Sequence, residues 1–341
     1  MAVTGANLSG DHRRRLPILQ LKGRALTRLR YGPYICVDLG SLDALPYLVD
    51  SDIEIDVIPV FQAFLRPDSV VLDIGANFGL YTALAGAVAL RRGHLYAFEA
   101  NPEVFHCLQG TILANGFWPS SRIDAANVLV ADRCGRGTLY YDPDVPLSGT
   151  MSNMVFTDAN HRSVEVDMTT IDAYLRGDLA VDLVKIDVEG HEPSVLRGMA
   201  QTIARSPRIR LIIEFSSALL QQTVGAEEFV RQIHSLGLDI CRIMPNATLR
   251  LAASHADLPE FGYCLLTRTP QADIDLIERQ HNSLATRLRK WLRRRRSRRR
   301  DRFSGRLLEH VPQAEMPVNS ANRTSSSRPL SMSSSEPNAF M

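Results

Sequence analysis

The sequence lacks the features that mark several classes of protein. No apolar run approaches the roughly 18 residues that a membrane-spanning helix needs. The first fifteen residues contain no apolar segment of the kind found in secretory signals. The five cysteines are scattered and include no CxxC pair, which argues against a disulfide framework or a structural zinc site. These absences predict a cytoplasmic protein with reduced thiols.

The net charge of +2 hides an uneven distribution along the chain. Eleven Lys or Arg residues and one Asp lie in Arg287–Arg302, so this segment carries a charge of +10 and the rest of the chain −8. Such a segment can bind nucleic acid or anionic lipid headgroups, or it can be a solvated run of charge. We therefore predict a mildly acidic domain with a basic arm, and any partner of that arm is expected to be anionic.

Composition divides the chain into four segments. Residues 1–50 are predicted to be an N-terminal leader, irregular over its first part, and residues 51–270 the folded domain. Residues 271–303 predict a basic helix. Residues 304–341 are rich in Ser, Pro and Asn and cannot bury enough apolar surface to offset the entropy of ordering, so we expect a disordered tail.

Within the predicted domain, strand-like and helix-like patterns alternate. Strands are predicted at residues 70–74, 94–98, 123–130, 135–142, 163–167, 183–186, 209–215, 239–243 and 263–267. Helices are predicted at residues 80–90, 102–114, 192–204 and 226–236, with a further helical pattern, interrupted by Pro59, at residues 52–65. Repeated strand–helix units indicate an α/β fold with a mostly parallel sheet covered on both faces. The last two strands have no long helix between them, which predicts an antiparallel edge.

The segment VVLDIGANFG combines a buried strand, an acid and a glycine loop. Glycines at this turn let backbone amides approach a ligand closely. The dinucleotide pattern GxGxxG is absent, and an acid at the strand end would repel a pyrophosphate. S-adenosylmethionine has no phosphate and carries an ammonium and a sulfonium, so it suits this loop better; an ordinary turn with an acidic helix cap is the alternative. The candidate cofactor contacts here are Asp73, Gly75, Ala76, Asn77 and Gly79.

Acidic and polar residues also follow the next two predicted strands. The second strand ends in Glu99, whose carboxylate can accept hydrogen bonds from both hydroxyls of a ribose. Asn127 and Leu129, near the third strand, are expected to flank the adenine. An NAD-dependent oxidoreductase stays open as an alternative, although the missing GxGxxG disfavours it.

A second cluster of ionisable residues lies in DLVKIDVEGHE, residues 182–192. Its apolar strand delivers several charged groups to the carboxyl end of the sheet, where ligands of open α/β sheets bind. Such crowding is unfavourable unless the groups pair or bind a ligand. We take Asp187, Glu189 and His191 as candidate catalytic residues. Lys185 is also explained by pairing with a carboxylate, and Glu192 by capping the following helix.

In these segments the chain resembles the FkbM family of class I methyltransferases. The matching stretches are VVLDIGANFGLYT, YAFEANPEVFHCLQGTILANG, MTTIDAYL, DLVKIDVEGHEPSVLRGM and IRLIIEF, within roughly residues 52–268. The resemblance implies a Rossmann-like, seven-stranded, doubly wound sheet with an antiparallel last strand. It also implies S-adenosylmethionine as cofactor and O-methylation of a hydroxyl on a sugar, glycan or natural product. Ala100 departs from the family, which commonly has a proline after the acid; this should not affect the ribose contact.

Methyl transfer to a hydroxyl is helped by a base that removes the proton of the acceptor. His191 is the natural base, because an unperturbed imidazole titrates near pH ~6.5. Asp187 could act instead, or could orient the acceptor. We expect no dedicated metal ion, although Asp187, Glu189 and His191 could together hold a divalent ion that lowers the pKa of the hydroxyl.

Two other functions stay open. A nucleic-acid methyltransferase could use the arginine-rich arm, but the acidic domain and the lack of an NPPY-like or cysteine motif disfavour it. A non-catalytic binding module is disfavoured by the acids at both cofactor positions. The acceptor itself is not encoded in any motif. We expect its specificity to lie in the entry residues 30–65 and in the irregular segment of residues 142–160, because loops carry no transferable code.

Overall fold

The computed structural model describes residues 19–283, apart from residues 22, 50–52, 143, 151–160 and 176. Contacts divide the chain into residues 1–285 and residues 286–341, and the second unit lies outside the described residues. The predicted tail and the Arg287–Arg302 arm therefore lie outside them as well. In the described part, no helix combines the length and the apolarity that crossing a bilayer needs.

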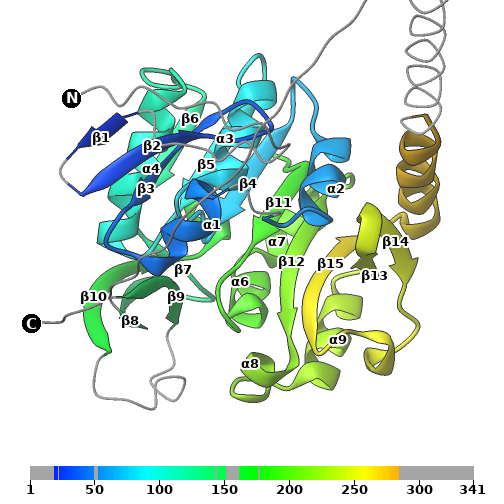
Figure 1. The fold of residues 1–341 in the computed structure, drawn as a ribbon. Helices are drawn as coiled ribbons and strands as arrows, with labels where there is room; N and C mark the ends of the chain where they lie inside the picture. The colour runs from blue at the N-terminus through cyan, green and yellow to red at the C-terminus, as the bar shows by residue number, and fades with distance from the viewer. Residues whose placement is uncertain are drawn as a thin grey trace, which may run out of the picture. The chain divides into compact units, whose positions relative to one another are not determined.

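The central sheet has eight strands within the described residues (Figure 1). In spatial order they are β14 (Thr248–Leu251), β13 (Asp239–Met244), β15 (Phe261–Thr267), β12 (Arg210–Ser216), β11 (Leu183–Ile186), β4 (Val70–Ile74), β5 (His94–Phe98) and β6 (Ile123–Ala126). The five strands from β12 to β6 are parallel, and β15 is antiparallel to both β12 and β13. The Rossmann-like, doubly wound, mostly parallel sheet is confirmed. The antiparallel strand predicted at the edge lies inside the sheet, and the short β14 forms the edge.

Helices cover both faces of this sheet because alternate strand residues point to opposite sides. Val71 belongs to one apolar core, and its neighbours Val70 and Leu72 belong to the other. The first core includes residues of α2 (Val57–Phe64), α3 (Leu80–Ala89) and α4 (Pro102–Ala114). The second includes residues of α5 (Ile171–Tyr174), α6 (Glu192–Gly198), α7 (Ala200–Arg205), α8 (Ser217–Gln221) and α9 (Ala226–Ser235). The helix predicted at residues 192–204 is thus two helices, divided at Met199, whose φ of −125° is not helical. Residues 270–283 are also helical.

Residues 19–38 form a three-stranded antiparallel sheet, so the irregular leader predicted over this part of residues 1–50 is wrong. Its strands are β1 (Leu19–Leu21), β2 (Arg24–Arg28) and β3 (Tyr34–Asp38). Strand β3 packs on α4: Ile35 and Val37 are fully buried, and the Cys36 N–H donates to Thr111 Oγ1 over 2.8 Å. Basic residues on the exposed side of such short strands hide the apolar alternation in the sequence.

A third sheet of four strands lies beside the central one. Its spatial order is β7 (Leu129–Val130), β10 (Arg162–Thr169), β8 (Gly135–Asp142) and β9 (Val145–Thr150). The single strand predicted at residues 123–130 is therefore two strands in different sheets, since β6 pairs with β5 and β7 pairs with β10. Within the segment of residues 142–160, which was expected to be irregular, residues 145–150 form strand β9. Residues 151–160 lie outside the described part. A short helix, α1 (Leu45–Leu48), follows the N-terminal sheet.

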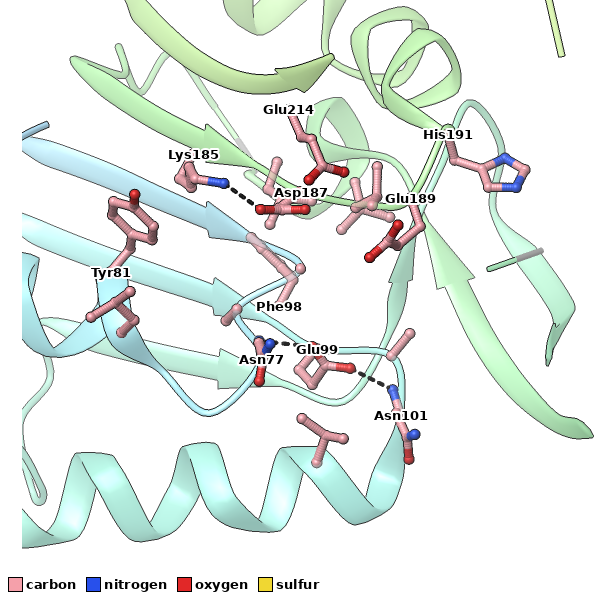
Figure 2. A pocket seen from close by; sticks show the side chains of 18 of the residues that line it. Asn77, Tyr81, Phe98, Glu99, Asn101, Lys185, Asp187, Glu189, His191 and Glu214 are labelled. Carbon is pink, nitrogen blue, oxygen red and sulfur yellow. Dashed lines mark hydrogen bonds and ion pairs between the residues drawn. The ribbon is translucent and has the colours of Figure 1, made fainter. Parts of the chain in front are cut away.

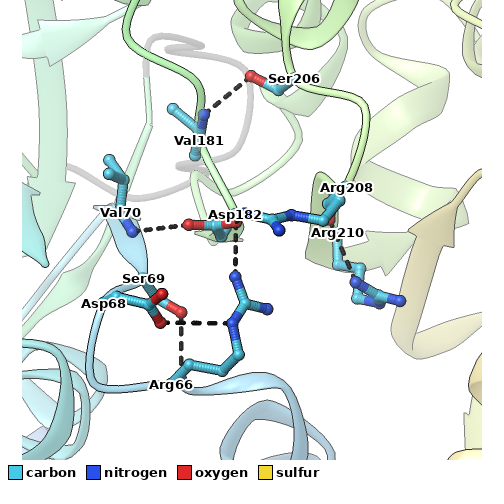
Figure 3. A network of polar contacts seen from close by, with 9 residues as sticks. All are labelled: Arg66, Asp68, Ser69, Val70, Val181, Asp182, Ser206, Arg208 and Arg210. Carbon is cyan, nitrogen blue, oxygen red and sulfur yellow. Dashed lines mark hydrogen bonds and ion pairs between the residues drawn. The ribbon is translucent and has the colours of Figure 1, made fainter.

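The amino ends of β4, β11 and β12 are tied together by Asp182 (Figure 3). Its carboxylate accepts hydrogen bonds from the Val70 N–H (3.0 Å), Arg66 Nη2 (2.8 Å) and Arg208 Nη2 (3.3 Å). This network fixes the register of the central strands at one end. The opposite, carboxyl ends of the same strands are left to line a cavity.

Candidate functional site

A cavity of about 320 Å³ opens at the carboxyl ends of β4, β5, β11 and β12 (Figure 2). Strand order reverses between β4 and β11, because the chain continues from β4 outward to β5 and β6 and only later returns to β11. Open α/β sheets bind their ligands at such a reversal. Residues of α1 and of the segment before α2 also line the cavity, so the N-terminal part of the chain helps to form it.

The loop between β4 and α3 is held by backbone contacts on two sides. The N–H groups of Gly75 and Ala76 both donate to the Phe98 carbonyl, over 3.0 and 2.8 Å. Gly75 has a φ of +77°, and a Cβ at this position would lie 1.8 Å from the Asp187 carbonyl oxygen. Glycine is therefore required here both by its backbone conformation and by the close approach of the loop after β11.

Glu99, at the end of β5, receives two backbone hydrogen bonds. Its Oε2 accepts from the Asn77 N–H (2.9 Å) and its Oε1 from the Asn101 N–H (2.8 Å). Burial raises the pKa of Glu99 to about 7, although these backbone donors oppose the shift. Each oxygen of this carboxylate has two lone pairs, so both can accept a further hydrogen bond from a ligand in the cavity.

The predicted cofactor residues fall into two groups. Those that line the cavity are Gly75, Ala76, Asn77, Glu99 and Leu129. The other three, Asp73, Gly79 and Asn127, are outside its lining. The Asn127 amide donates to the carbonyls of Glu99 and Ala100 and so supports the loop that carries Glu99.

Asp73 is 1% exposed and accepts a hydrogen bond from Thr82 Oγ1 over 2.6 Å. Burial raises the pKa of Asp73 to about 6, against the lowering effect of the Thr82 hydrogen bond and of Lys185. This carboxylate joins the end of β4 to helix α3. Its contribution to cofactor binding stays a prediction.

At the end of β11, Lys185 forms a buried ion pair with Asp187. The Nζ–Oδ2 distance is 2.6 Å, and the ammonium lies 5.0 and 4.7 Å from the ring centres of Tyr81 and Tyr263. Burial lowers the pKa of Lys185, but the charges of Asp187 and Glu54 outweigh it and leave the pKa raised. The pairing predicted for Lys185 is confirmed, and Asp187 is oriented by this ammonium and by the Tyr263 hydroxyl at 3.4 Å.

The other candidate catalytic residues line the same cavity. Burial, and then the charge of Asp187, raise the pKa of Glu189 to about 8. Burial lowers the pKa of His191, although Asp132 opposes the shift. Glu192 is buried in the first turn of α6 and accepts from the Val188 N–H over 3.1 Å. The N-cap of this helix is His191, so Glu192 is an acid of the first turn and not the predicted cap.

Three carboxylates at this end of the sheet are close enough to share a ligand. Asp187, Glu189 and Glu214 each offer an oxygen within 4.8 Å of the others. His191 is not part of this group, so the alternative set of Asp187, Glu189 and His191 for a metal ion is wrong in its third member. Figure 2 shows His191 on the far side of Glu189 from Lys185.

Many of the lining residues were not among the predicted site residues. Four of these are important for the charge of the site: Glu54, Tyr81, Glu214 and Tyr263. The Tyr81 hydroxyl donates to the Glu54 carboxylate, and burial raises the pKa of Glu54. A sequence signal existed for Glu214, which interrupts an otherwise apolar strand, IRLIIEF. The other three come from separate elements and carry no local pattern that marks them.

The lining fits S-adenosylmethionine. Glu99 has a carboxylate of the kind that accepts hydrogen bonds from a ribose diol, and Val128, Leu129 and Val130 add an apolar wall to the lining. Acidic groups at the end of β11 suit a cationic ligand. Among the described residues, the lining contains no arginine, and its one lysine, Lys185, lies in β11 and is paired with Asp187. No basic side chain of this lining is therefore available to a pyrophosphate, which disfavours a cofactor that carries one.

The chain is also similar to known proteins. Residues 73–250 match the family model of the methyltransferase FkbM domain. The hexuronic acid methyltransferase AglP of Haloferax volcanii is 26% identical over 159 residues, which cover 44% of this chain and 58% of that protein. Methyltransferase 1 of Beauveria bassiana is 27% identical over 157 residues, covering 39% of this chain and 59% of that protein. The chain thus matches less than two thirds of the length of either relative.

Among solved structures, methyltransferase FkbM of Methylobacillus flagellatus is 16% identical to the chain, with a TM-score of 0.38 over 60% of this chain and 47% of that one. A similarity this distant adds nothing to the fold described above. The family model, by contrast, spans more than half of the chain and includes the carboxyl ends of all four strands at the cavity. The chain therefore belongs to the FkbM family of methyltransferase domains, and its cofactor is S-adenosylmethionine.

Proposed function

We propose that the protein transfers a methyl group from S-adenosylmethionine to a hydroxyl of a sugar, a glycan or a natural product. The observation that carries this proposal is the shared cavity. Glu99 and its apolar wall form one side, and Asp187, Glu189 and His191 form the other. A donor bound at the first side would direct its reactive end towards groups that can accept a proton. S-adenosylmethionine, when bound, supplies a methyl group activated by its sulfonium.

His191 is the proposed base. Because burial lowers its pKa below the ordinary value of about 6.5, the imidazole is neutral at pH 7 and can accept a proton. As the acceptor oxygen takes the methyl group, its O–H bond breaks and the proton moves to the imidazole. Asp187, held by Lys185 and Tyr263, is the proposed group that orients the acceptor hydroxyl.

The charge of the cavity supports a neutral acceptor. Six carboxylates line it, whereas Lys185 is the only lysine or arginine in the lining and is already paired. An acceptor with an ionised carboxylate or phosphate would be repelled, while the hydroxyls of a sugar could donate to these acids. The name of the Haloferax relative, a hexuronic acid methyltransferase, supports a sugar as the class of acceptor. A hexuronic acid carries a carboxylate, which this acidic lining disfavours, so the lining supports an uncharged sugar and a hydroxyl as the site of methylation.

Incubation with methyl-labelled S-adenosylmethionine and a fractionated extract of the host tests the proposal. We expect label in a carbohydrate or small-molecule fraction, as a methyl ether that survives mild alkaline hydrolysis. Label released by mild alkali would identify an ester and contradict O-methylation of a hydroxyl. Label in nucleic acid would favour the rival that uses the arginine-rich arm, and cofactor binding without any labelled product would favour a non-catalytic module.

A further inference from the structure

The ends of β11 and β12 bring three carboxylates together inside the cavity. Asp187 and Glu189 follow β11, and Glu214 lies in β12. One oxygen from each lies within 4.8 Å of the other two. Figure 2 shows the carboxylates of Glu214 and Asp187 facing one another, with that of Glu189 beside them.

Glu214 provides a second observation that points to a ligand. Its side chain lines the cavity, and the residue is only 7% exposed. Its Oε2 is buried and has no hydrogen-bond partner among the described residues. Buried polar atoms are almost always paired, and a buried carboxylate without a partner is strongly unfavourable. The geometry of this oxygen therefore calls for a group that enters from the cavity.

The balance of charge indicates a cation. Lys185 is the nearest ammonium, and its short ion pair goes to Asp187. When ionised, the three carboxylates and this lysine carry a net charge of −2. A divalent cation would neutralise them, whereas an uncharged acceptor hydroxyl would leave the negative charge in place.

We propose that Asp187, Glu189 and Glu214 bind a divalent cation of the magnesium class. All three donors are carboxylate oxygens, which Mg²⁺ and Mn²⁺ prefer, and no sulfur or imidazole belongs to the group. The role of the ion rests on the function proposed above: it would hold the acceptor oxygen and lower the pKa of its hydroxyl, so that His191 removes the proton more easily.

Binding of Mn²⁺ to the ligand-free protein tests this site without any turnover. We expect electron paramagnetic resonance to detect one Mn²⁺ per chain, with at least tenfold weaker binding in Glu214→Gln and in Glu189→Gln. Glu278→Gln, which changes an exposed carboxylate on the helix of residues 270–283, is the matched control and should bind as the wild type does. Wild-type protein that binds no Mn²⁺, or a Glu214→Gln variant that binds it unchanged, would overturn the proposal.

Two further measurements distinguish a failure of the metal site from loss of the fold and from a failure of the proposed function. Circular dichroism checks that each variant is folded; if Glu214→Gln is not, Glu189→Gln gives the answer. Methylation assays in EDTA then distinguish the failures. A wild type that binds no Mn²⁺ but forms the labelled ether overturns the metal site alone. A wild type that binds Mn²⁺ but labels no hydroxyl overturns the proposed function alone.

Discussion

Burial raises the pKa of several of the acids that line this cavity. Glu99, Glu189 and Glu214 reach pKa values of about 7, 8 and 10. His191, which lines the same cavity, is shifted in the opposite direction because burial disfavours its charged form too. In the ligand-free cavity, burial thus favours the uncharged form of these glutamates and of the imidazole, so that His191 is the neutral group that can accept a proton near pH 7.

At the residue scale, replacement of His191 with Ala should strongly reduce turnover and leave cofactor binding unchanged. Loss of a general base lowers kcat by about 10²- to 10⁴-fold. In the wild type, kcat should fall only at a pH below about 6.5, because the pKa of His191 is lowered, and this acid limb should be missing in the variant. Steady-state kinetics over pH 5 to 8 measure both effects. His255→Ala is the control on an exposed histidine, and a fully active His191→Ala enzyme would exclude the imidazole as base.

The residues of the cavity that could be predicted from the sequence share one segment, whereas the residues that could not be predicted are brought to the cavity only by the fold. Asp187, Glu189 and His191 lie within five positions of one another, so their crowding is visible in the chain itself. Glu214 and Glu54 enter the same cavity from β12 and from the segment before α2. Glu214 is a single acid in an apolar strand, whereas Glu54 lies among the alternating acids of DIEID, residues 52–56. The distance of each from the other acids of the cavity depends on the order of the strands, which no local pattern encodes.

At the scale of elements, the site depends on the contact between the loops after β4 and β11. Gly75→Ala would place a methyl group against the Asp187 carbonyl and would also strain a φ of +77°. We expect this variant to lose about 2 to 4 kcal/mol of stability, from overpacking and from the left-handed conformation together. Urea unfolding measures the loss.

Gly116→Ala is the matched control for this change. Gly116 has a φ of +68°, but nothing lies within 4 Å of an added Cβ. The Gly116→Ala variant should therefore lose only the stability that the left-handed backbone conformation costs an alanine, about 1 to 2 kcal/mol. Equal losses in the two variants would show that the close approach of the two loops contributes no stability.

The elements that sequence patterns predict best are the buried strands. Strands β4 and β11 are wholly buried and appear in the sequence as unbroken apolar runs followed by acids. Strands β2 and β14 are four or five residues long and expose charged side chains, so no continuous pattern marks them. The N-terminal sheet is fixed instead by its packing on α4, a contact between segments about 75 residues apart.

At the scale of the whole molecule, the buried acids make stability depend on pH. Each has a folded-state pKa above its unfolded value, so the folded state binds more protons. The stability from such a group is fully present below its unfolded pKa, near 4, and is lost as the pH rises through its folded pKa. Between pH 7 and 9, Glu189 titrates in the folded state, because its pKa is about 8. Glu214, whose pKa is about 10, is still largely protonated in the folded state over this range.

We therefore expect the melting temperature of the ligand-free protein to fall between pH 7 and pH 9 in the presence of a chelator. The melting temperature of the Glu214→Gln variant should fall less over this range, because an amide does not titrate. Differential scanning calorimetry of the two proteins over this range tests the expectation. Parallel pH dependences in the wild type and the variant would show that Glu214 is not the source of the effect.

The central claim is that the cavity holds S-adenosylmethionine with Glu99 at its ribose. Calorimetric titration with S-adenosylhomocysteine tests it most directly, in the wild type, in Glu99→Ala and in the control Glu103→Ala. Glu103 is exposed, lies four residues from Glu99, and is outside the lining of the cavity. Loss of two hydrogen bonds to a carboxylate costs about 3 kcal/mol, so we expect Glu99→Ala to bind at least 100-fold more weakly and Glu103→Ala to bind as the wild type does. Unchanged affinity in a folded Glu99→Ala protein would contradict the account.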